Sequence, residues 1–285
     1  MRWKPSPFIT LSCTAHAAAL AGVCAMPQHW PWMAGAVAAN QLLLTGAGLW
    51  PRSDWLGANL TRLPAAAAAR GEVALTFDDG PDPEVTPEVL DQLAAQGATA
   101  SFFCVGQRVR EQAPLARRIA AAGHTLENHT QTHPNHFAAL GPSGMRAQIR
   151  DAQASIAATV GRAPRFFRAV AGLRNPMLDP VLQTEGLLLA HWTRRGFDTR
   201  DADAERVLTR LTRGLAAGDV LLLHDGHARR DAQGRPVVLT LLPRLLARLR
   251  EAGLKAVALD QAVPLGHGPN PARPAATLQD APRRP

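Results

Sequence analysis

Three groups of side chains in this sequence have the residue types and spacing of a metal-assisted hydrolytic site. Asp78 and Asp79 are adjacent carboxylates, His129 and His133 lie four residues apart, and His224 ends an apolar run. Adjacent carboxylates leave a strand in different directions, so one can bind a metal while its neighbour faces a substrate. The two His side chains project to one side of a helical turn and can share one ion. One carboxylate with two His leaves ligand positions open for water, which is typical of catalytic sites.

Each group alone has an ordinary explanation. The Asp-Asp-Gly-Pro sequence at 78–81 is by itself most often a surface turn. A single pair of His four residues apart is usually accidental. The two groups occur together with a third, Leu-Leu-Leu-His-Asp at 221–225, and this combination indicates an enzyme site.

The elements that must position these residues alternate between strand and helix. Apolar runs predict strands at 72–77, 99–105, 124–128, 165–170, 187–192, 219–224 and 254–259. Between them, helices are predicted from the N-cap Thr86 to Gly97 and at 114–122, 145–160, 178–184, 204–217 and 239–251. Alternation of this kind predicts an α/β fold in which about seven parallel strands form a barrel-like sheet.

The candidate residues fall where parallel α/β folds place functional groups, beyond the carboxyl ends of the strands. In chain order these are Asp78 and Asp79, His129 and His133, Arg168, Trp192 and Asp198, and His224. We therefore expect them to meet at one end of the sheet.

These motifs resemble those of the polysaccharide deacetylase family, the carbohydrate esterases with a NodB-homology domain. The matching segments are Thr-Phe-Asp-Asp-Gly-Pro at 76–81, Glu-Asn-His-Thr-Gln-Thr-His-Pro at 127–134, Phe-Arg at 167–168, Trp192 with Asp198, and Leu-His-Asp at 223–225. They keep the family's order and similar spacings from residue 72 to about 260. The resemblance implies a distorted (β/α)7-type barrel that hydrolyses N-acetyl, and sometimes O-acetyl or N-formyl, groups on sugars.

The resemblance also implies a role for each residue. Asp79, His129 and His133 would hold a divalent metal, usually zinc, and Asp78 would be the general base. Arg168 would orient Asp78, Asp198 would tune His224, and His224 would be the general acid. The backbone N–H of Ala171 would hold the oxyanion, and Trp192 would contact the substrate.

The third and fourth motifs depart from the family pattern. Arg-Ala-Val-Ala-Gly at 168–172 replaces the frequent Arg-Pro-Pro-aromatic-Gly, which removes an aromatic wall of the groove. Arg195 stands where an acidic residue is common, and Thr199 follows Asp198 in place of Trp. A more basic, less aromatic groove suits a phosphate-bearing substrate such as a lipid-linked sugar.

Two uncharged segments, about 8–26 and 33–49, precede the motifs. Each is about long enough to cross the roughly 30 Å apolar core of a bilayer as a helix. Basic residues flank the pair on both outer sides, whereas the turn between them, 27–32, has no Lys or Arg. The positive-inside bias therefore favours a hairpin in a bacterial inner membrane, with the catalytic domain facing the cytoplasm.

Two alternatives to this hairpin remain open. The first segment could be a signal or a single anchor, which would place the domain in the periplasm. The segments could also be buried helices of a soluble protein, although such helices normally carry polar residues on one face.

The sequence predicts three regions: a membrane segment at 1–52, a catalytic domain at 70–263 and a flexible Pro-rich tail at 264–285. The three Cys provide neither a disulfide framework nor a zinc-thiolate spacing. The net charge of +8 comes from scattered Arg residues without a nucleic-acid-binding module, so we expect an anionic membrane surface, and not nucleic acid, as the partner.

Two other functions would use similar residues. A catalytically inactive relative that only binds glycans is disfavoured because every metal and acid–base position is filled. A metal-dependent phosphoesterase would need a second metal site, and the sequence offers no further cluster at ligand spacing. The leading prediction is a metal-dependent deacetylase of an N-acylated, possibly lipid-linked, carbohydrate.

Overall fold

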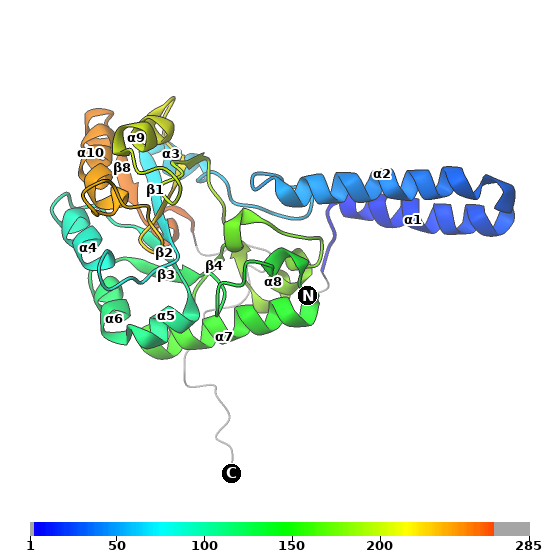
Figure 1. Cartoon of the computed structure of the whole chain (residues 1–285), viewed down its shortest axis with the longest axis horizontal. Coiled ribbons are helices and arrows are strands. Elements are labelled where there is room, and N and C mark those ends of the chain that lie inside the picture. Colours follow the sequence, from blue (N-terminus) through cyan, green and yellow to red (C-terminus); the bar gives the residue numbers. More distant parts are fainter. Residues whose placement is uncertain (1–2, 265–285) are drawn as a thin grey trace, which may run out of the picture.

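The structure is a computed structural model that describes residues 3–264, and it consists of an α/β body from which a helical hairpin projects (Figure 1). The tail predicted to be flexible lies, from residue 265 onward, outside the described residues. The strands are β1 Glu72–Asp78, β2 Ser101–Cys104, β3 Thr125–Asn128, β4 Phe166–Phe167, β5 Leu188–Leu189, β6 Arg194–Arg195, β7 Val220–His224 and β8 Lys255–Val257. The helices of the body are α3 Ala65–Ala69, α4 Thr86–Ala94, α5 Gly106–Glu111, α6 Ala113–Ala121, α7 Pro142–Val160, α8 Leu178–Glu185, α9 Ala204–Thr212, α10 Val237–Glu251 and α11 Leu259–Ala262.

The strands form one curled sheet in the order β5-β4-β3-β2-β1-β7-β6, with β8 also paired to β1. Every pair of neighbouring strands is parallel. Helices cover the outside of this sheet, with α4 and α6 next to α5 and α7 along one side (Figure 1). The predicted α/β barrel-like fold is confirmed.

Strand β1 shows how the sequence builds this sheet. Its side chains alternate between two faces, as strand geometry requires. Val73, Leu75 and Phe77 pack under the outer helices, in the same apolar cluster as the buried Leu side chains of α10. Ala74 belongs to the cluster inside the curl, so Thr76 and Asp78, two and four residues further along the strand, also face inward.

The segment between the hairpin and β1 fills the gap between the two ends of the sheet. Leu60 forms a parallel bridge to Ala190, just after β5, and Arg62 forms an antiparallel bridge to Asp219, just before β7. Leu63 is buried in the cluster inside the curl. Residues outside the predicted domain of 70–263 thus contribute to the same core.

The structure corrects three details of the predicted elements. The two-residue strand β6 and the short helices α3, α5 and α11 were not predicted, because two to six residues are too few for a visible period. Helix α9 ends at Thr212 and not at 217, since Gly214 takes a left-handed conformation. Thr86 is the first residue of α4, not its N-cap, and its hydroxyl lies 2.5 Å from the buried carboxylate of Asp225.

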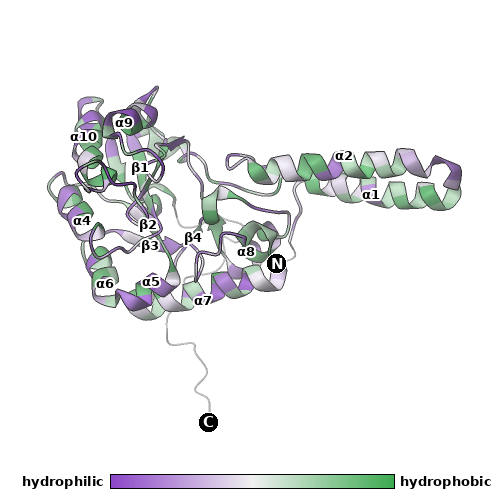
Figure 2. Ribbon diagram, in the orientation of Figure 1, coloured by the Kyte–Doolittle hydropathy of each residue, from purple (hydrophilic) through white to green (hydrophobic). Residues whose placement is uncertain are grey.

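Both predicted N-terminal segments are helices, α1 Pro7–Ala25 and α2 Trp30–Leu49, joined by a short turn at Pro27–His29. Figure 2 shows them as mostly apolar, with a hydrophilic tip. Among residues 3–264, α1 alone is, by length and composition, long and apolar enough to cross a membrane. An apolar helix of this kind near the N-terminus serves either as a membrane anchor or as a signal sequence.

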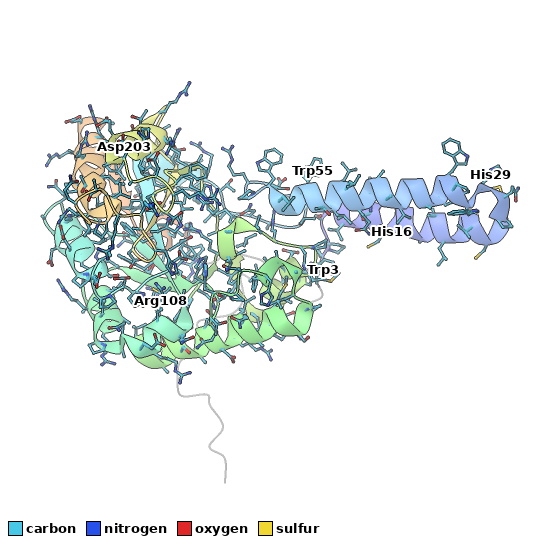
Figure 3. The ribbon with its side chains drawn as sticks, viewed as in Figure 1. Trp3, His16, His29, Trp55, Arg108 and Asp203 are labelled. Atoms are coloured by element: carbon cyan, nitrogen blue, oxygen red, sulfur yellow. The ribbon has the colours of Figure 1, made fainter. Side chains whose placement is uncertain are left out.

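Polar side chains in the middle of the hairpin bond to one another across the two helices. Asn40 donates to the Ser12 hydroxyl at 2.6 Å, and the Gln41 amide lies 3.0 Å from His16 Nε2. Figure 3 places His16 midway along the hairpin and His29 at its tip. At the other end, the indole of Trp3 donates to Asp179 on α8 at 2.7 Å, which ties the hairpin to the body.

Candidate active site

The carboxyl ends of the strands enclose a pocket of about 180 Å³. This volume is below the roughly 300 Å³ at which pockets begin to enclose a whole drug-sized ligand, so it suits one substituent of a larger substrate. Its lining residues are Asp78, Asp79, His129, His133, Asn135, Val170, Ala171, Gly172, Trp192, Arg195, Thr199, Leu222, His224 and His227. Seven of the nine predicted site residues are in this lining, and the other two, Arg168 and Asp198, lie directly behind it.

Sheet register brings the two sides of the site together. In β1, Asp78 pairs with His224 of β7, so residues 146 positions apart in the sequence become neighbours on adjacent strands. On its other side Asp78 pairs with Phe103 of β2. The parallel arrangement therefore fixes the base and acid candidates relative to each other before any side chain contact is considered.

Asp79, His129 and His133 form the candidate metal site. Asp79 Oδ1 lies 3.2 Å from His129 Nε2 and 3.1 Å from His133 Nε2, and all three ligand atoms lie within 4.8 Å of one another. Ligands about 2.0–2.1 Å from a tetrahedral zinc would be roughly 3.3 Å apart, so the spacing fits a single cation. Burial alone would raise the pKa of Asp79, but hydrogen bonds from the two His outweigh it and hold this pKa well below its usual range.

The ring of His129 has the orientation of a ligand. Its Nδ1 lies 2.9 Å from the backbone oxygen of Arg168, and this contact requires Nδ1 to carry the proton. The hydrogen bond to Asp79 requires the doubly protonated ring, whereas in the neutral ring that binds a metal the lone pair is on Nε2, which faces Asp79. Fixing the tautomer through the other ring nitrogen is the usual arrangement of metal-binding His.

The two His do not lie on one helical turn, contrary to the prediction. They belong to a loop after β3 in which Thr130 and His133 both have positive φ, 70° and 53°. Side chains hold this loop: Asn128 Oδ1 accepts from Thr130 N at 2.9 Å, and Thr130 Oγ1 accepts from His133 N at 3.0 Å. The i, i+4 spacing thus arises from a strained loop, which the sequence pattern could not distinguish from a helix.

Asp78 is held by a buried arginine. Arg168 Nη1 donates to Asp78 Oδ1 at 2.6 Å and to the Thr76 hydroxyl at 2.9 Å. The remaining donors of Arg168 bond to the backbone oxygens of Ala190 and His191, at 2.9 and 3.0 Å. With all three of its nitrogens bonded, the guanidinium fixes one Asp78 oxygen and leaves the carboxylate at the pocket wall.

His224 is paired with Asp198. Asp198 Oδ1 lies 2.8 Å from His224 Nδ1, and Oδ2 accepts from the His224 backbone N–H at 2.8 Å. Burial alone would lower the pKa of His224, but the negative charges of Asp198 and Asp78 outweigh it and raise the pKa to about 9. At neutral pH the imidazole therefore carries its proton.

Ala171 and Trp192 line the same pocket as the candidate ligands. Ala171 lies in a short 3-10 turn, Val170–Gly172, with a positive φ of 54°. Trp192 is buried and packs against Gly172, where a Cβ would overlap the indole ring and Pro51. The hairpin linker, through Pro51, thus supports the loop that carries Ala171.

The structure adds residues that the sequence patterns did not assign. Arg108 of α5 donates to the backbone oxygen of Asp79 at 2.8 Å, and its other terminal nitrogen lies 2.8 Å from His227 Nε2. His227 Nδ1 lies 3.3 Å from Asp79 Oδ2, so the second oxygen of this carboxylate is engaged as well. Because α5 was not predicted and Arg108 belongs to no spaced motif, only the fold shows this contact.

Comparison with known proteins agrees with the geometry. Residues 66–188 match the family described as Polysaccharide deacetylase. A chitooligosaccharide deacetylase of Sinorhizobium fredii is 34% identical over 203 residues, which cover 68% of this chain and 93% of the relative. A peptidoglycan-N-acetylglucosamine deacetylase of Bacillus cereus is 30% identical over 199 residues, which cover 68% and 89%. The solved structure of a family 4 carbohydrate esterase from Streptomyces lividans, in complex with acetate, has 33% identity and a TM-score of 0.59, covering 65% of this chain and 91% of that one.

The chain belongs to the polysaccharide deacetylase family. The predicted family and the predicted enzyme class, a carbohydrate deacetylase, are confirmed. Within residues 3–264, Asp79, His129 and His133 are the one group of three or more potential ligands close enough to share a cation. That part of the chain therefore has no second metal site of the kind that a two-metal phosphoesterase needs.

Proposed function

We propose that this protein is a divalent-metal-dependent hydrolase that removes an N-acyl group, N-acetyl in the first instance, from an amino sugar of a polysaccharide or lipid-linked glycan. The proposal is carried by one arrangement: a three-ligand cation site beside Asp78, with the protonated His224 in the same pocket. Relatives named as deacetylases of chitooligosaccharide and of peptidoglycan N-acetylglucosamine support the choice of substrate class.

Asp79, His129 and His133 would hold the cation, for which we propose zinc. Two His and one carboxylate are a frequent ligand set of catalytic zinc. Bound there, the cation would lower the pKa of a water and would supply a positive charge for the developing oxyanion. Arg108 and His227 keep Asp79 in place through its backbone oxygen and its second carboxylate oxygen.

Asp78 is proposed as the general base that takes a proton from the attacking water. Its Oδ1 is bound by Arg168, so the carboxylate is oriented without being free to rotate. The base and the ligand Asp79 are adjacent in sequence, which keeps the proton acceptor next to the site where water is activated. The backbone N–H of Ala171 is proposed to stabilise the oxyanion that forms on the acyl group.

His224 is proposed as the general acid. An amine leaves readily only after its nitrogen is protonated, and His224 carries a proton at neutral pH because its pKa is raised to about 9. Asp198 binds Nδ1, so Nε2 is the nitrogen that donates to the leaving amine. Trp192, in the pocket lining, would pack against the acyl group.

We further propose that the α1–α2 hairpin anchors the enzyme in the bacterial inner membrane. Both helices lack charged residues, and their polar side chains pair across the hairpin, which satisfies them without water. Large apolar side chains, among them Leu11, Leu20 and Leu42, are exposed along the helices. The cytoplasmic orientation remains a prediction from the basic residues that flank the hairpin.

The test is acetate release by the full chain, purified in detergent, from chitooligosaccharides and from a lipid-linked N-acetylated sugar. Activity should disappear on treatment with a chelator and return when zinc is added. A protein that holds one zinc ion but releases no acetate from either substrate would support the alternative of a catalytically inactive glycan-binding protein.

A further inference from the structure

Arg195 is a positively charged side chain in the pocket wall without a partner in the protein. Its neighbour on β6, Arg194, points to the other face of the strand. Each of the three Arg194 nitrogens donates a hydrogen bond, to Asp219, Arg213 O and Gly214 O. In contrast, Arg195 lines the pocket and makes no ion pair or hydrogen bond within residues 3–264, where its Nε is buried without a partner. A buried N–H of this kind is costly unless something else accepts it.

Two aromatic rings hold the Arg195 guanidinium in place. Its central carbon lies 5.3 Å from the centre of the Trp192 ring and 5.0 Å from that of Phe197. Rings engage the flat face of a guanidinium and leave the N–H groups at its edge free to donate. Phe197 does not line the pocket, and 41% of its surface is exposed, so this ring covers the guanidinium from the solvent side.

The acidic residues nearest to Arg195 are already committed to other groups. Asp78 accepts from Arg168 at 2.6 Å, and both oxygens of Asp198 contact His224 at 2.8 Å. Asp79 Oδ1 faces His129 and His133. These carboxylates stabilise Arg195 through space, but none of them takes up its hydrogen bonds.

We propose that Arg195 binds an anionic substituent, a phosphate or a carboxylate, on the N-acylated sugar. This inference rests on the proposed deacetylase function and narrows its substrate to a negatively charged amino sugar. The Arg edge matches two oxygens of either anion, and Thr199 in the same lining adds a hydroxyl donor. With a pocket volume that suits one substituent, the acyl group would enter the pocket while the anion binds to Arg195 in its wall.

The test compares acetate release by the full chain from three substrates: neutral chitooligosaccharides, N-acetylglucosamine 1-phosphate and N-acetylmuramic acid. The wild type should prefer at least one of the two anionic sugars, measured by kcat/KM. Arg195→Gln should reduce that preference on the order of 10- to 100-fold, the effect of a charge-assisted hydrogen bond, whereas Arg195→Lys should retain part of it. Arg200→Gln removes an exposed positive charge outside the lining, and its preference should stay within about twofold of the wild type.

A second measurement uses inhibition by inorganic phosphate and by acetate with the neutral substrate. The inhibition constant of at least one anion should rise in Arg195→Gln and not in Arg200→Gln. If Arg195→Gln loses only the preference for N-acetylglucosamine 1-phosphate, the anion that Arg195 binds is a phosphate. If it loses only the preference for N-acetylmuramic acid, the anion is a carboxylate.

The possible failures can be told apart. The wild type could deacetylate neutral sugars with the same kcat/KM as both charged ones, or Arg195→Gln could keep the wild-type preference. Either result would refute the proposed anion site and leave the proposed deacetylase function intact. If the wild type releases no acetate from any of the three sugars or from the lipid-linked N-acetylated sugar, the proposed function itself fails, and the inference about Arg195 fails with it.

Discussion

Arg168 donates to Asp78 at 2.6 Å, and the two side chains are only 0% and 5% exposed. The guanidinium also lies 3.9 Å from the centre of the Phe103 ring, so packing as well as hydrogen bonds fixes its plane. The charge, hydrogen bonds and ring stacking of Arg168 at this buried position hold the proposed base, Asp78, in place.

Replacing Arg168 should therefore affect both stability and turnover. Arg168→Met leaves a buried carboxylate unpaired, and we expect a loss of about 3–5 kcal/mol in the free energy of unfolding. Arg168→Lys keeps the charge but cannot reproduce the planar set of bonds to Thr76, Ala190 and His191, so kcat/KM should fall about 100-fold or more. Denaturant unfolding and acetate release measure the two effects. Arg150→Lys, at an exposed ion pair on α7, is the control, and an Arg168→Lys enzyme equal to it would contradict a positioning role.

Replacing the proposed base and replacing a metal ligand should have different effects on metal content and on turnover. Asp78→Asn should retain bound zinc while kcat drops on the order of 10²- to 10⁴-fold, since only the proton acceptor is removed. His129→Ala should lose both zinc and activity. Elemental analysis after gel filtration, with acetate release on the same samples, makes the comparison. His136→Ala, an exposed His outside the pocket, should change neither quantity; near-full activity of Asp78→Asn would refute the proposed mechanism.

The rate should depend on pH through His224. Its pKa is raised to about 9, so the acid form is present at neutral pH, and kcat/KM should fall as pH rises through that value. The stability contributed by the protonated group follows the same sign: it is present below the ordinary pKa of His and is lost as pH rises through about 9. Asp198→Asn removes the largest favourable charge, so the alkaline limb should move to lower pH. Asp201→Asn removes a carboxylate paired with Arg206 instead, and its profile should match that of the wild type.

Gly80 follows the two carboxylates, and a side chain there has no room. A Cβ would overlap both carboxylate oxygens of the buried Asp225. We expect Gly80→Ala to destabilise the protein by about 1–3 kcal/mol, the usual range for overpacking, and to lower zinc affinity by displacing Asp79. Gly144→Ala in α7 meets only ordinary contacts and should be neutral or stabilising. Thermal melting of both variants, with and without zinc, would show whether the effect is specific to Gly80.

The orientation of the hairpin can be measured with a reporter fused after Pro285. The basic residues Arg2, Lys4, Arg52 and Arg62 flank the helices on their outer sides, so we expect a reporter that works in the cytoplasm to be active. Strong activity of a reporter that requires the periplasm would instead indicate a single anchor or a cleaved signal.

The sequence predicted the fold and the site best where a residue type or a composition allows few structural alternatives. Strand-ending carboxylates and His could be assigned to the same edge of the sheet because parallel strands end together. The two long uncharged segments could be assigned as helices because their length and composition leave few alternatives.

Other features depended on contacts that no local pattern encodes. His129 and His133 have helical spacing, yet left-handed backbone at Thr130 and His133 places them in a loop. Arg108 reaches Asp79 from a helix too short to show a period. Arg195 stood out as a departure from the family motif, but only the structure shows that its charge has no partner among the neighbouring carboxylates.

Leu60 and Arg62 of the linker form bridges to Ala190 and Asp219. The α/β body therefore cannot be separated from the linker as an independent module. A chain cut at residue 70 would lose both bridges and bare the backbone edges next to β5 and β7. Open strand edges recruit other chains, so such a fragment should aggregate even though every catalytic candidate is present. An exchange of the hairpin for another anchor, in evolution or in the laboratory, would have to retain the segment from about residue 50 onward.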